Sequence, residues 1–427
     1  MDGVAPFLGR DLHPRLMQTK LSPEFKGTRD GEAAEAILRK CVHCGFCTAT
    51  CPTYQLLGDE LDGPRGRIYL MKQMLEGEPV TPKTQLHLDR CLTCRNCEST
   101  CPSGVQYGEL VDIGRRIVEE RVPRPAKERV VRWLLKEGLT SPAFGPAMKL
   151  GQALRPALPA VLKDKVPAKA GPRAHQWPTR EHPRKVLMLM GCVQPAMMPN
   201  INSATARVLD AAGIQTLVAD GSGCCGAIRT HLADTEGGLA DMRRNIDAWW
   251  PLVSSNQIEA IVMNASGCGV TVKEYGHSLA NDAAYADKAR RVSELTRDLS
   301  ELLPDIGPKL KNKLRKPKAR ELVFHPPCTL QHGQQLRGGV ETHLNALGFD
   351  VKLAAGESHL CCGSAGTYSV LQPELAHRLR DRKLAQLEAV QAQVIVSANI
   401  GCIQHLQTGT TVPVRHWIEV LDEALFG

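Results

Sequence analysis

The sequence is poor in aromatic residues and has no long run of apolar residues. Phenylalanine, tyrosine and tryptophan make up 4% of the 427 residues, too few for the stacked aromatic platforms of proteins that bind single-stranded nucleic acid. No uninterrupted apolar stretch approaches the roughly 20 residues that a membrane-spanning helix needs. We therefore expect no nucleic-acid partner and no transmembrane helix.

The start of the chain also lacks the features of an export signal. Residues 1–17 contain charges and prolines but no apolar core of the kind that signal peptides have. Densely spaced cysteines in a chain without an export signal belong to a reducing compartment, where disulfides are rare. We therefore expect a cytoplasmic protein whose cysteines serve another purpose.

Cysteine, in contrast, is abundant, and half of the 16 cysteines fall into two identical motifs. Residues 41–52 and 91–102 both read C-x2-C-x2-C-x3-C-P. In bacterial ferredoxins this spacing holds [4Fe-4S] clusters, and the fourth cysteine of each motif ligates the other cluster. The sequence therefore predicts two [4Fe-4S] clusters, the first held by Cys41, Cys44, Cys47 and Cys101, and the second by Cys91, Cys94, Cys97 and Cys51.

Zinc is the main alternative for these motifs, because C-x2-C pairs also bind zinc. Zinc ribbons, however, need neither a third cysteine at the same step nor the C-x3-C-P ending. The doubled motif favours an electron carrier. Arg65, Arg67 and Lys72 lie on the piece that connects the motifs, and they either tune the potential of a cluster or are ordinary solvated helix charges.

Hydrophobic periodicity indicates where the domains divide. Helices are expected over 30–40, 67–76, 110–120 and 126–136. An apolar stretch broken by prolines follows at 144–166, and then a Pro- and charge-rich connector at 169–185. The expected domains are a ferredoxin-like domain at 1–125, a helical and Pro-rich linker at 126–184, and two repeats at 185–308 and 309–427.

After residue 185, short β-rich runs alternate with helices, which indicates α/β units around a parallel sheet. Strands are expected at 186–190, 260–263, 322–324 and 394–396, and helices at 204–212, 239–249, 340–347 and 375–390. The fold expected is α+β overall, with a mainly helical two-cluster ferredoxin-like N-terminal domain followed by a duplicated α/β region. The cysteines carry the duplication, because Cys192, Cys224, Cys225 and Cys268 recur in the same order as Cys328, Cys361, Cys362 and Cys402.

Each vicinal cysteine pair precedes a glycine, in the order Cys-Cys-Gly (CCG). We expect the four thiols of each repeat on loops at one end of its sheet, where open α/β sheets build their sites. A single free cysteine is often only a small buried hydrophobe, but eight in register favour a metal cluster or a redox-active thiol site. His325, His359 and His405 lie beside these loops and could be ligands or proton carriers. A hydrogen-bonded structural role is commoner for histidine, and we assign no catalytic residue.

The chain resembles the iron-sulfur subunits of bacterial glycolate oxidase along nearly its whole length. Conspicuous segments are Cys41–Cys47 (CVHCGFC), Gly58–Arg67 (GDELDGPRGR), Cys91–Cys97 (CLTCRNC), Ile246–Pro251 (IDAWWP), Lys273–Gly276 (KEYG), His359–Tyr368 (HLCCGSAGTY) and Arg415–Glu419 (RHWIE). The iron-sulfur subunits of anaerobic glycerol-3-phosphate dehydrogenase, of lactate utilisation systems and of heterodisulfide reductase are more distant relatives.

The resemblance implies a division of labour. Flavoprotein subunits oxidise glycolate to glyoxylate on FAD, and the iron-sulfur subunit passes the electrons towards a membrane quinone. It also implies a cytoplasmic subunit, peripheral on the inner face of the membrane. We expect no G-x-G-x-x-G after a strand, so FAD is expected only in the partner subunits. The basic run Lys309–Arg320 either contacts acidic lipid headgroups or is a solvated linker.

Two other functions remain open. The same relay could serve lactate or glycerol 3-phosphate, or the chain could be a heterodisulfide reductase-like thiol-disulfide enzyme. The fuller CCG pattern of heterodisulfide reductase closes each repeat with C-x-x-C, but Ala265 and Asn399 take the first position of that pair here. Four thiols per repeat remain. They could hold a further iron-sulfur cluster or form a quinone or subunit interface.

Overall fold

The computed structural model describes residues 17–157, 173–315 and 318–427. The chain forms two compact units, of which unit 1 comprises Met1–Asp89 and Cys97–Val122, and unit 2 comprises Arg90–Asn96 and Pro123–Gly427. The expectations about the first 16 residues, the end of the apolar stretch, the start of the connector and two residues of the basic run lie outside the described residues. The three boundaries between the four expected domains stay predictions.

Unit 1 is built from helices, as the sequence predicts. They are α1 (Arg29–Arg39), α2 (Phe46–Ala49), α3 (Pro52–Leu57), the 3-10 turn η1 (Glu60–Asp62), α4 (Pro64–Leu75), α5 (Pro82–Asp89), α6 (Asn96–Thr100) and α7 (Tyr107–Arg121). Leu38, Met71 and Leu110, on α1, α4 and α7, are completely buried. Gly114 lets α7 approach α4, because a Cβ there would lie 2.5 Å from the Met71 sulfur.

Unit 2 continues from the second motif with two helices and then the first repeat. The helices are α8 (Ala126–Thr140), α9 (Phe144–Ala153) and the 3-10 turn η2 (Arg155–Ala157). The first repeat contains β1 (Arg184–Met188), α11 (Gln194–Met197), α12 (Pro199–Ala211), β2 (Ile214–Leu217), α13 (Ala227–His231), α14 (Thr235–Ser254), β3 (Ala260–Met263), α15 (Ser266–Lys273), α16 (Tyr275–Ser278), α17 (Ala286–Leu295), β4 (Thr296–Asp298), η3 (Leu299–Leu302), α18 (Leu303–Leu310) and η4 (Lys311–Lys313).

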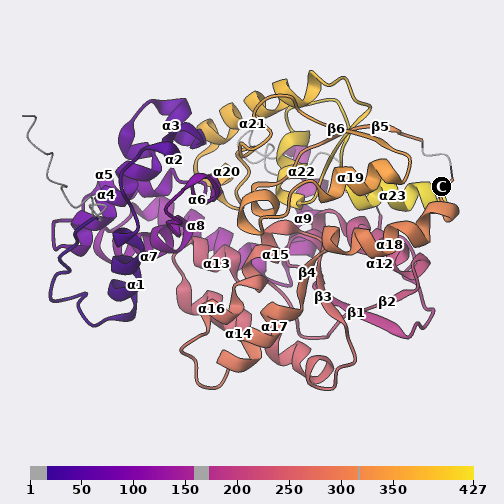
Figure 1. The fold of residues 1–427 in the computed structure, drawn as a ribbon, viewed down its shortest axis with the longest axis horizontal. Coiled ribbons are helices and arrows are strands. Elements are labelled where there is room, and N and C mark those ends of the chain that lie inside the picture. The colour runs from indigo at the N-terminus through magenta and orange to yellow at the C-terminus, as the bar shows by residue number, and fades with distance from the viewer. Residues whose placement is uncertain (1–16, 158–172, 316–317) are drawn as a thin grey trace, which may run out of the picture. The chain divides into compact units, whose positions relative to one another are not determined.

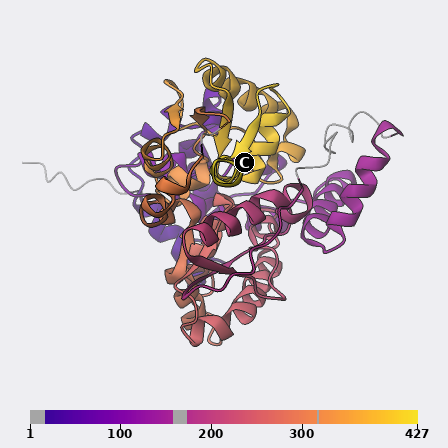
Figure 2. The ribbon, with the colours of Figure 1, turned by 90° about the vertical axis from the view of Figure 1, so that its right-hand side faces the viewer.

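The second repeat, orange to yellow in Figures 1 and 2, has the same order of strands, but α16 and α17 of the first repeat have no counterpart before its last strand. It contains β5 (Glu321–Phe324), the π-helical turn η5 (Thr329–Gly333), α19 (Gly339–Ala346), β6 (Asp350–Leu353), α20 (Tyr368–Leu371), α21 (Pro373–Glu388), β7 (Val394–Ser397), α22 (Ile400–Gln407), β8 (Val414–His416) and α23 (Trp417–Phe426). The two sheets have the orders β2-β1-β3-β4 and β6-β5-β7-β8, and every strand pair is parallel. The predicted duplication of an α/β unit is therefore confirmed.

The two repeats share a large hydrophobic core, and the first repeat also has a cluster of its own, which includes Ile246 and Trp249. Val186 and Val262 of the first sheet belong to the same buried cluster as Ile395 and Trp417 of the second repeat. Helix α12 packs on α23, and α18 packs on α19. In the order of elements α19 is the counterpart of α12, and α23 the counterpart of α18. The same helix pairing therefore occurs twice with the repeats exchanged, as in a pseudo-twofold dimer.

Four strands were not predicted from the sequence, and all of them are short. β2, β4, β6 and β8 have three or four residues each, and β4 reads Thr-Arg-Asp. Each lies at an edge of its sheet, where one side of the strand needs no apolar cover. The central strands β1, β3, β5 and β7 are the ones predicted, because each contains a buried run of three or four apolar residues.

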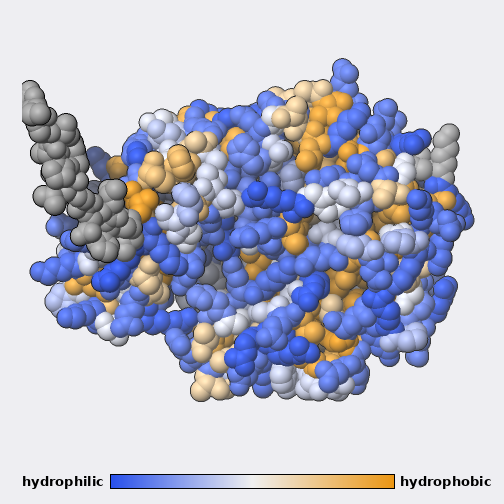
Figure 3. All heavy atoms as spheres, viewed as in Figure 1, coloured by the Kyte–Doolittle hydropathy of each residue, from blue (hydrophilic) through white to orange (hydrophobic). Residues whose placement is uncertain are grey.

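The described surface adds one observation about membranes. Helices long and apolar enough to cross a bilayer are absent from the described residues. On the face shown in Figure 3, hydrophilic residues cover most of the described surface, with hydrophobic ones scattered among them.

Candidate metal centres

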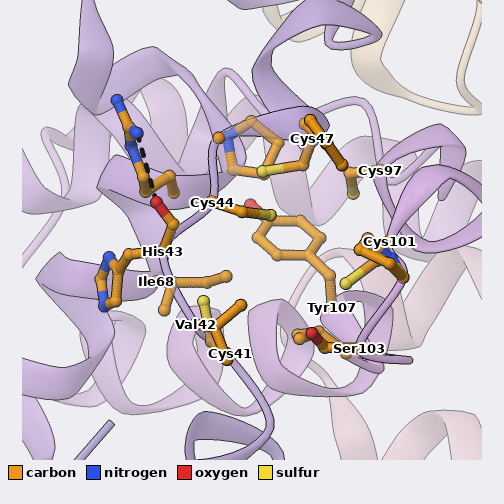
Figure 4. A pocket seen from close by; sticks show the side chains of 16 residues that line it. Cys41, Val42, His43, Cys44, Cys47, Ile68, Cys97, Cys101, Ser103 and Tyr107 are labelled. Atoms are coloured by element: carbon orange, nitrogen blue, oxygen red, sulfur yellow. Dashed lines mark hydrogen bonds between the residues drawn. The ribbon is translucent and has the colours of Figure 1, made fainter. Parts of the chain in front are cut away.

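The first ferredoxin motif closes around a pocket in unit 1. Its lining includes Cys41, Cys44 and Cys47 from the loop between α1 and α3, and Cys101 from the loop after α6. Figure 4 shows these four sulfurs around the pocket, with the Tyr107 ring beside them. The structure thus brings together the four cysteines that the sequence assigns to the first cluster. Cys97 also lines this pocket.

The chemistry of this lining fits an iron-sulfur cluster. Its non-cysteine residues are apolar or neutral apart from His43 and Arg65, and no carboxylate lines the pocket. Burial raises the pKa of the Cys47 thiol to about 11 and also raises that of Cys41, so free thiols here would be protonated. Several thiols converging in an apolar pocket are the donor set of a cluster, since iron binds and stabilises the thiolates.

The two ferredoxin loops have the same unusual backbone. In the first loop, His43 and Gly45 have positive φ values of 53° and 85°. In the second loop, Thr93 and Arg95, at the equivalent positions, have φ values of 52° and 59°. Non-glycine residues seldom adopt this conformation. Its recurrence at the same two steps indicates that both loops are shaped for the same ligand.

The second expected ligand set is divided between the units. Cys51 and Cys97 belong to unit 1, and Cys91 and Cys94 to unit 2. Within unit 1, the Cys51 sulfur lies 3.3 Å from the Thr53 hydroxyl. Within unit 2, the backbone N–H of Thr93 donates to the Cys91 sulfur at 3.4 Å. The assignment of these four cysteines to one cluster stays a prediction.

Arg67 belongs to a buried polar network behind Cys51 and is not a solvated helix charge. Its side chain is 1% exposed and pairs with the buried Asp62 at 3.5 Å. Its guanidinium donates to the carbonyl of His87 at 2.7 Å and to the Thr53 hydroxyl at 3.2 Å. Because Thr53 also contacts the Cys51 sulfur, the network positions that cysteine. Sequence reasoning missed Asp62 and His87, although Asp62 lies in the same Gly58–Arg67 segment.

The other two cations of the connecting piece have acidic partners. Arg65 pairs with Glu60 at 2.6 Å and donates to the carbonyl of His43 at 3.5 Å, so it lies at the rim of the first pocket. Lys72 pairs with Glu76 at 2.5 Å. Of the three, Arg65 is the cation that lines the first pocket.

In the first repeat the four cysteines meet at one end of the sheet. Cys192 follows β1, the pair Cys224 and Cys225 precedes α13, and Cys268 lies in α15. Hydrogen bonds with Cys224, followed by burial, raise the pKa values of Cys192 and Cys225, whereas the same contacts lower that of Cys224. The thiols therefore form one connected cluster, as predicted.

The second repeat repeats this arrangement. The sulfurs of Cys328 and Cys361 lie 3.8 Å apart, and contacts continue from Cys361 to Cys362 and from Cys362 to Cys402. One detail of the prediction is wrong, because Cys268 and Cys402 lie in the first turn of α15 and α22 and not in loops. A cysteine at the start of a helix receives the favourable field of the helix N-terminus as a thiolate.

The glycine after each pair is required by close packing. Gly226 and Gly363 have φ values of 95° and 90°. A Cβ at Gly226 would lie 2.8 Å from the carbonyl oxygen of Gly238, and one at Gly363 would lie 2.5 Å from that of Ala376. The two glycines therefore let α14 and α21 press against the cysteine loops.

The three histidines beside these loops differ in their burial and in their contacts. A ring nitrogen of His405 lies 3.1 Å from the carbonyl oxygen of Ala376, a structural contact. His359 is half-buried, and its carbonyl is 3.3 Å from the Asn96 amide nitrogen of the second ferredoxin loop. His325 is fully buried, and burial followed by the charge of Lys383 lowers its pKa to about 3. Only His325 lies with two cysteines, Cys362 and Cys402, in a potential metal-binding group among the described residues.

The ferredoxin loop assigned to unit 2 contacts the second repeat. Besides the Asn96 bond, the Tyr368 hydroxyl donates to the carbonyl of Arg90 at 3.2 Å. Arg95 forms an ion pair with Glu274 of the first repeat. The loop with Cys91 and Cys94 therefore lies beside the CCG segment of the second repeat.

One sequence statement needs correction. Gly221–Gly226 (GSGCCG) does have G-x-G-x-x-G spacing and follows a strand, β2, that was not predicted. In a dinucleotide site this motif follows the first strand of a βαβ unit and opens a helix on the pyrophosphate. Here β2 is an edge strand, α13 has five residues, and two motif positions are the buried cysteines. This segment is part of the thiol cluster.

Known proteins match the chain along most of its length. Residues 37–105 match the family model of the 4Fe-4S dicluster domain, and residues 186–273 and 322–407 each match that of a cysteine-rich domain. The glycolate oxidase iron-sulfur subunit of Escherichia coli (strain K12) is 56% identical over 96% of this chain and 99% of its own length.

Two further relatives are less similar. The probable glycolate oxidase iron-sulfur subunit of Bacillus subtilis (strain 168) is 30% identical over 91% of this chain and 92% of its own. Lactate utilization protein A of Bacillus licheniformis is 25% identical over 56% of this chain and 99% of its own. With the cysteine motifs, these matches identify an iron-sulfur protein whose N-terminal region carries two [4Fe-4S] clusters.

Proposed function

Because the chain belongs to the family of glycolate oxidase iron-sulfur subunits, we propose that it is the electron-transfer subunit of a glycolate-oxidising complex. Flavoprotein partners in this complex oxidise glycolate to glyoxylate, and the electrons pass through this chain towards a membrane quinone. The observation that carries the proposal is the convergence of Cys41, Cys44, Cys47 and Cys101 on one pocket, in a chain that matches a glycolate oxidase subunit end to end.

The cluster ligands follow from the motif and the pocket. Each [4Fe-4S] cluster accepts and returns one electron at a time, so two clusters divide the electron pair of a flavin into single steps. For the first cluster we propose Cys41, Cys44, Cys47 and Cys101, which line the unit 1 pocket. For the second we propose Cys91, Cys94, Cys97 and Cys51, because the two loops share the same sequence spacing and the same left-handed residues.

The polypeptide around the clusters sets the conditions for electron transfer. Ile68, Val105 and Tyr107 line the first pocket and limit water around it. Arg65 supplies a positive charge at its rim, which favours the reduced, more negative state of a cluster. Arg67 and Asp62 hold Thr53 against Cys51, which keeps this ligand in a fixed orientation.

We place the subunit on the cytoplasmic side of the membrane, bound through its partners. The family name supports the existence of other subunits. Three of the six cations in the described part of the basic run contact the protein itself. Lys309 pairs with Asp305, Lys313 donates to the Ala211 carbonyl, and Lys318 pairs with Glu423. These contacts favour a structural role between the repeats over lipid binding.

The proposal is tested on the complex, purified without oxygen together with its flavoprotein subunits. Addition of glycolate should bleach the cluster absorbance and produce the EPR signals of reduced [4Fe-4S] clusters. Lactate and glycerol 3-phosphate should not do so, and this chain alone should not respond to glycolate. An assembly that is reduced only by lactate would contradict the proposal and favour the lactate alternative.

The thiol-disulfide alternative is tested with Cys224→Ser and Cys361→Ser in the same complex. A disulfide reductase would lose its activity on disulfide substrates in these variants. The electron-transfer subunit should have no such activity to lose. Disulfide reduction by the wild-type complex that disappears in either variant would favour the alternative.

A further inference from the structure

The second repeat contains a buried imidazole that the first repeat lacks. His325 follows β5, three residues before Cys328, and Leu189 occupies the equivalent place before Cys192. His325 is 1% exposed and Leu189 is 3% exposed. The two positions are therefore equally buried, but only one of them offers a metal ligand.

Ser397 fixes which nitrogen of His325 carries the proton. The Ser397 hydroxyl donates to the carbonyl oxygen of His325 at 3.0 Å. It lies 3.1 Å from Nδ1 of the same histidine, and its single proton is already used, so it accepts the Nδ1–H. The neutral ring then has a bare lone pair on Nε2. Such a partner on one nitrogen is the usual support of a histidine that binds metal through the other.

Nε2 has no protein partner among the described residues. It is a buried nitrogen atom without a hydrogen bond, a state that is unfavourable when nothing else satisfies the atom. A ring nitrogen of His325 and the sulfurs of Cys362 and Cys402 all lie within 4.8 Å of one another. A buried imidazole that lies beside two thiols and has one unsatisfied nitrogen is the arrangement expected of a metal ligand.

We propose that Nε2 of His325 is a metal ligand in the second repeat. The site there is a mixed nitrogen and sulfur site formed by His325 with Cys328, Cys361, Cys362 and Cys402, and it holds an iron-sulfur centre. The first repeat has the four equivalent thiols and Leu189, so its site is all sulfur. The two repeats therefore hold centres with different ligands.

The difference has a consequence for electron transfer. The imidazole of His325 is neutral, so it adds no negative charge to the four thiolates that both repeats share, whereas a thiolate at the same place would lower the reduction potential. The buried Lys383, whose amine donates to the carbonyl of Glu357, adds a positive charge near the thiols of the second repeat. The second centre should be the easier of the two to reduce. This inference goes beyond the proposed function, because it holds whatever the substrate of the complex is.

The test uses the full chain, purified without oxygen from cells fed with ¹⁵N-histidine. Pulsed EPR is recorded while the potential is stepped. The centre of the second repeat should show a strong ¹⁵N coupling from a nitrogen bound directly to iron. His325→Leu, which copies the first repeat, should abolish the coupling.

Two control variants show whether the nitrogen coupling comes from His325 itself. His325→Cys supplies a thiolate, so it should retain the iron, lose the nitrogen coupling and shift the midpoint to a more negative potential. His405→Leu removes a buried histidine of α22 whose ring nitrogen already has a carbonyl partner, and it should keep the coupling. A coupling that survives in His325→Cys would overturn the proposal. So would a wild-type centre without coupled nitrogen, or zinc in place of iron. None of these results depends on glycolate, so failure here leaves the proposed function standing.

Discussion

At the scale of single residues, the two repeats bury different polar groups at equivalent positions. Asp298 and His416 each end the last strand of a sheet and cap the helix that follows, with Glu301 and Glu419 completing a capping box. Both caps are almost fully buried. The sequence does not reveal that these two capping residues are buried, because the burial of a polar residue depends on what packs over it from the other repeat.

His416 makes the stability of the protein sensitive to acid. Burial lowers its pKa from 6.5 to about 3. In the unfolded chain the His416 imidazole therefore takes up a proton below about pH 6.5. In the folded protein it stays neutral until the pH approaches 3. Stability is complete above that pH and falls as the pH decreases towards 3. Between pH 6.5 and pH 5, protonation of this single group in the unfolded chain should lower the free energy of unfolding by about 2 kcal/mol.

His416→Asn should remove this part of the pH dependence. Asparagine keeps a side-chain oxygen for the cap but does not titrate. The measurement is urea unfolding at pH 7 and pH 5, followed by tryptophan fluorescence, since the neighbouring Trp417 is fully buried. The difference between the two pH values should be about 2 kcal/mol smaller in the variant. An equally large difference in both proteins would contradict the account.

At the scale of elements, the turn after each cysteine pair decides whether a CCG site can form. The central strands of each sheet were predictable, because β1, β3, β5 and β7 each contain a run of three or four apolar residues. The turn itself was recognised only as a glycine next to cysteine. Its reason, the approach of α14 and α21 to the loop, depends on contacts between residues distant in sequence.

A pair of glycine variants separates strain from packing in the second repeat. Gly348 and Gly363 both have positive φ, but only a Cβ at Gly363 meets backbone atoms. Gly348→Ala should lower the free energy of unfolding by about 1–2 kcal/mol through backbone strain alone, and the variant should keep all bound iron. Gly363→Ala should lower the free energy of unfolding clearly more, and this variant should lose the iron of the second repeat. Urea unfolding and iron analysis check both points, and equal losses in the two variants would show that the close approach is unimportant.

At the scale of the whole molecule, the register of the cysteines predicted the duplication without any structural knowledge. The ferredoxin motifs likewise predicted which four cysteines meet in the unit 1 pocket. The shared core of the repeats was not predictable, since the pairing of α12 with α23 joins segments about half the chain apart. The assignment of Arg90–Asn96 to unit 2 was unexpected for the same reason, because its contacts are with Glu274, His359 and Tyr368.

The pseudo-twofold pairing explains how two similar repeats acquire different sites. Each repeat buries its last helix against the other, so neither presents its core to water, and the thiol ends of the sheets are free to diverge. Leu189 and His325 are the clearest divergence, since they occupy equivalent places next to equivalent thiols.

The most direct test of the central claim is a count of iron and acid-labile sulfide in the full chain, purified without oxygen, together with its EPR spectrum after reduction. The N-terminal cysteines should account for about eight irons with matching sulfide, and the CCG sites should add to that number. Colourless protein that contains zinc in place of iron would contradict the account.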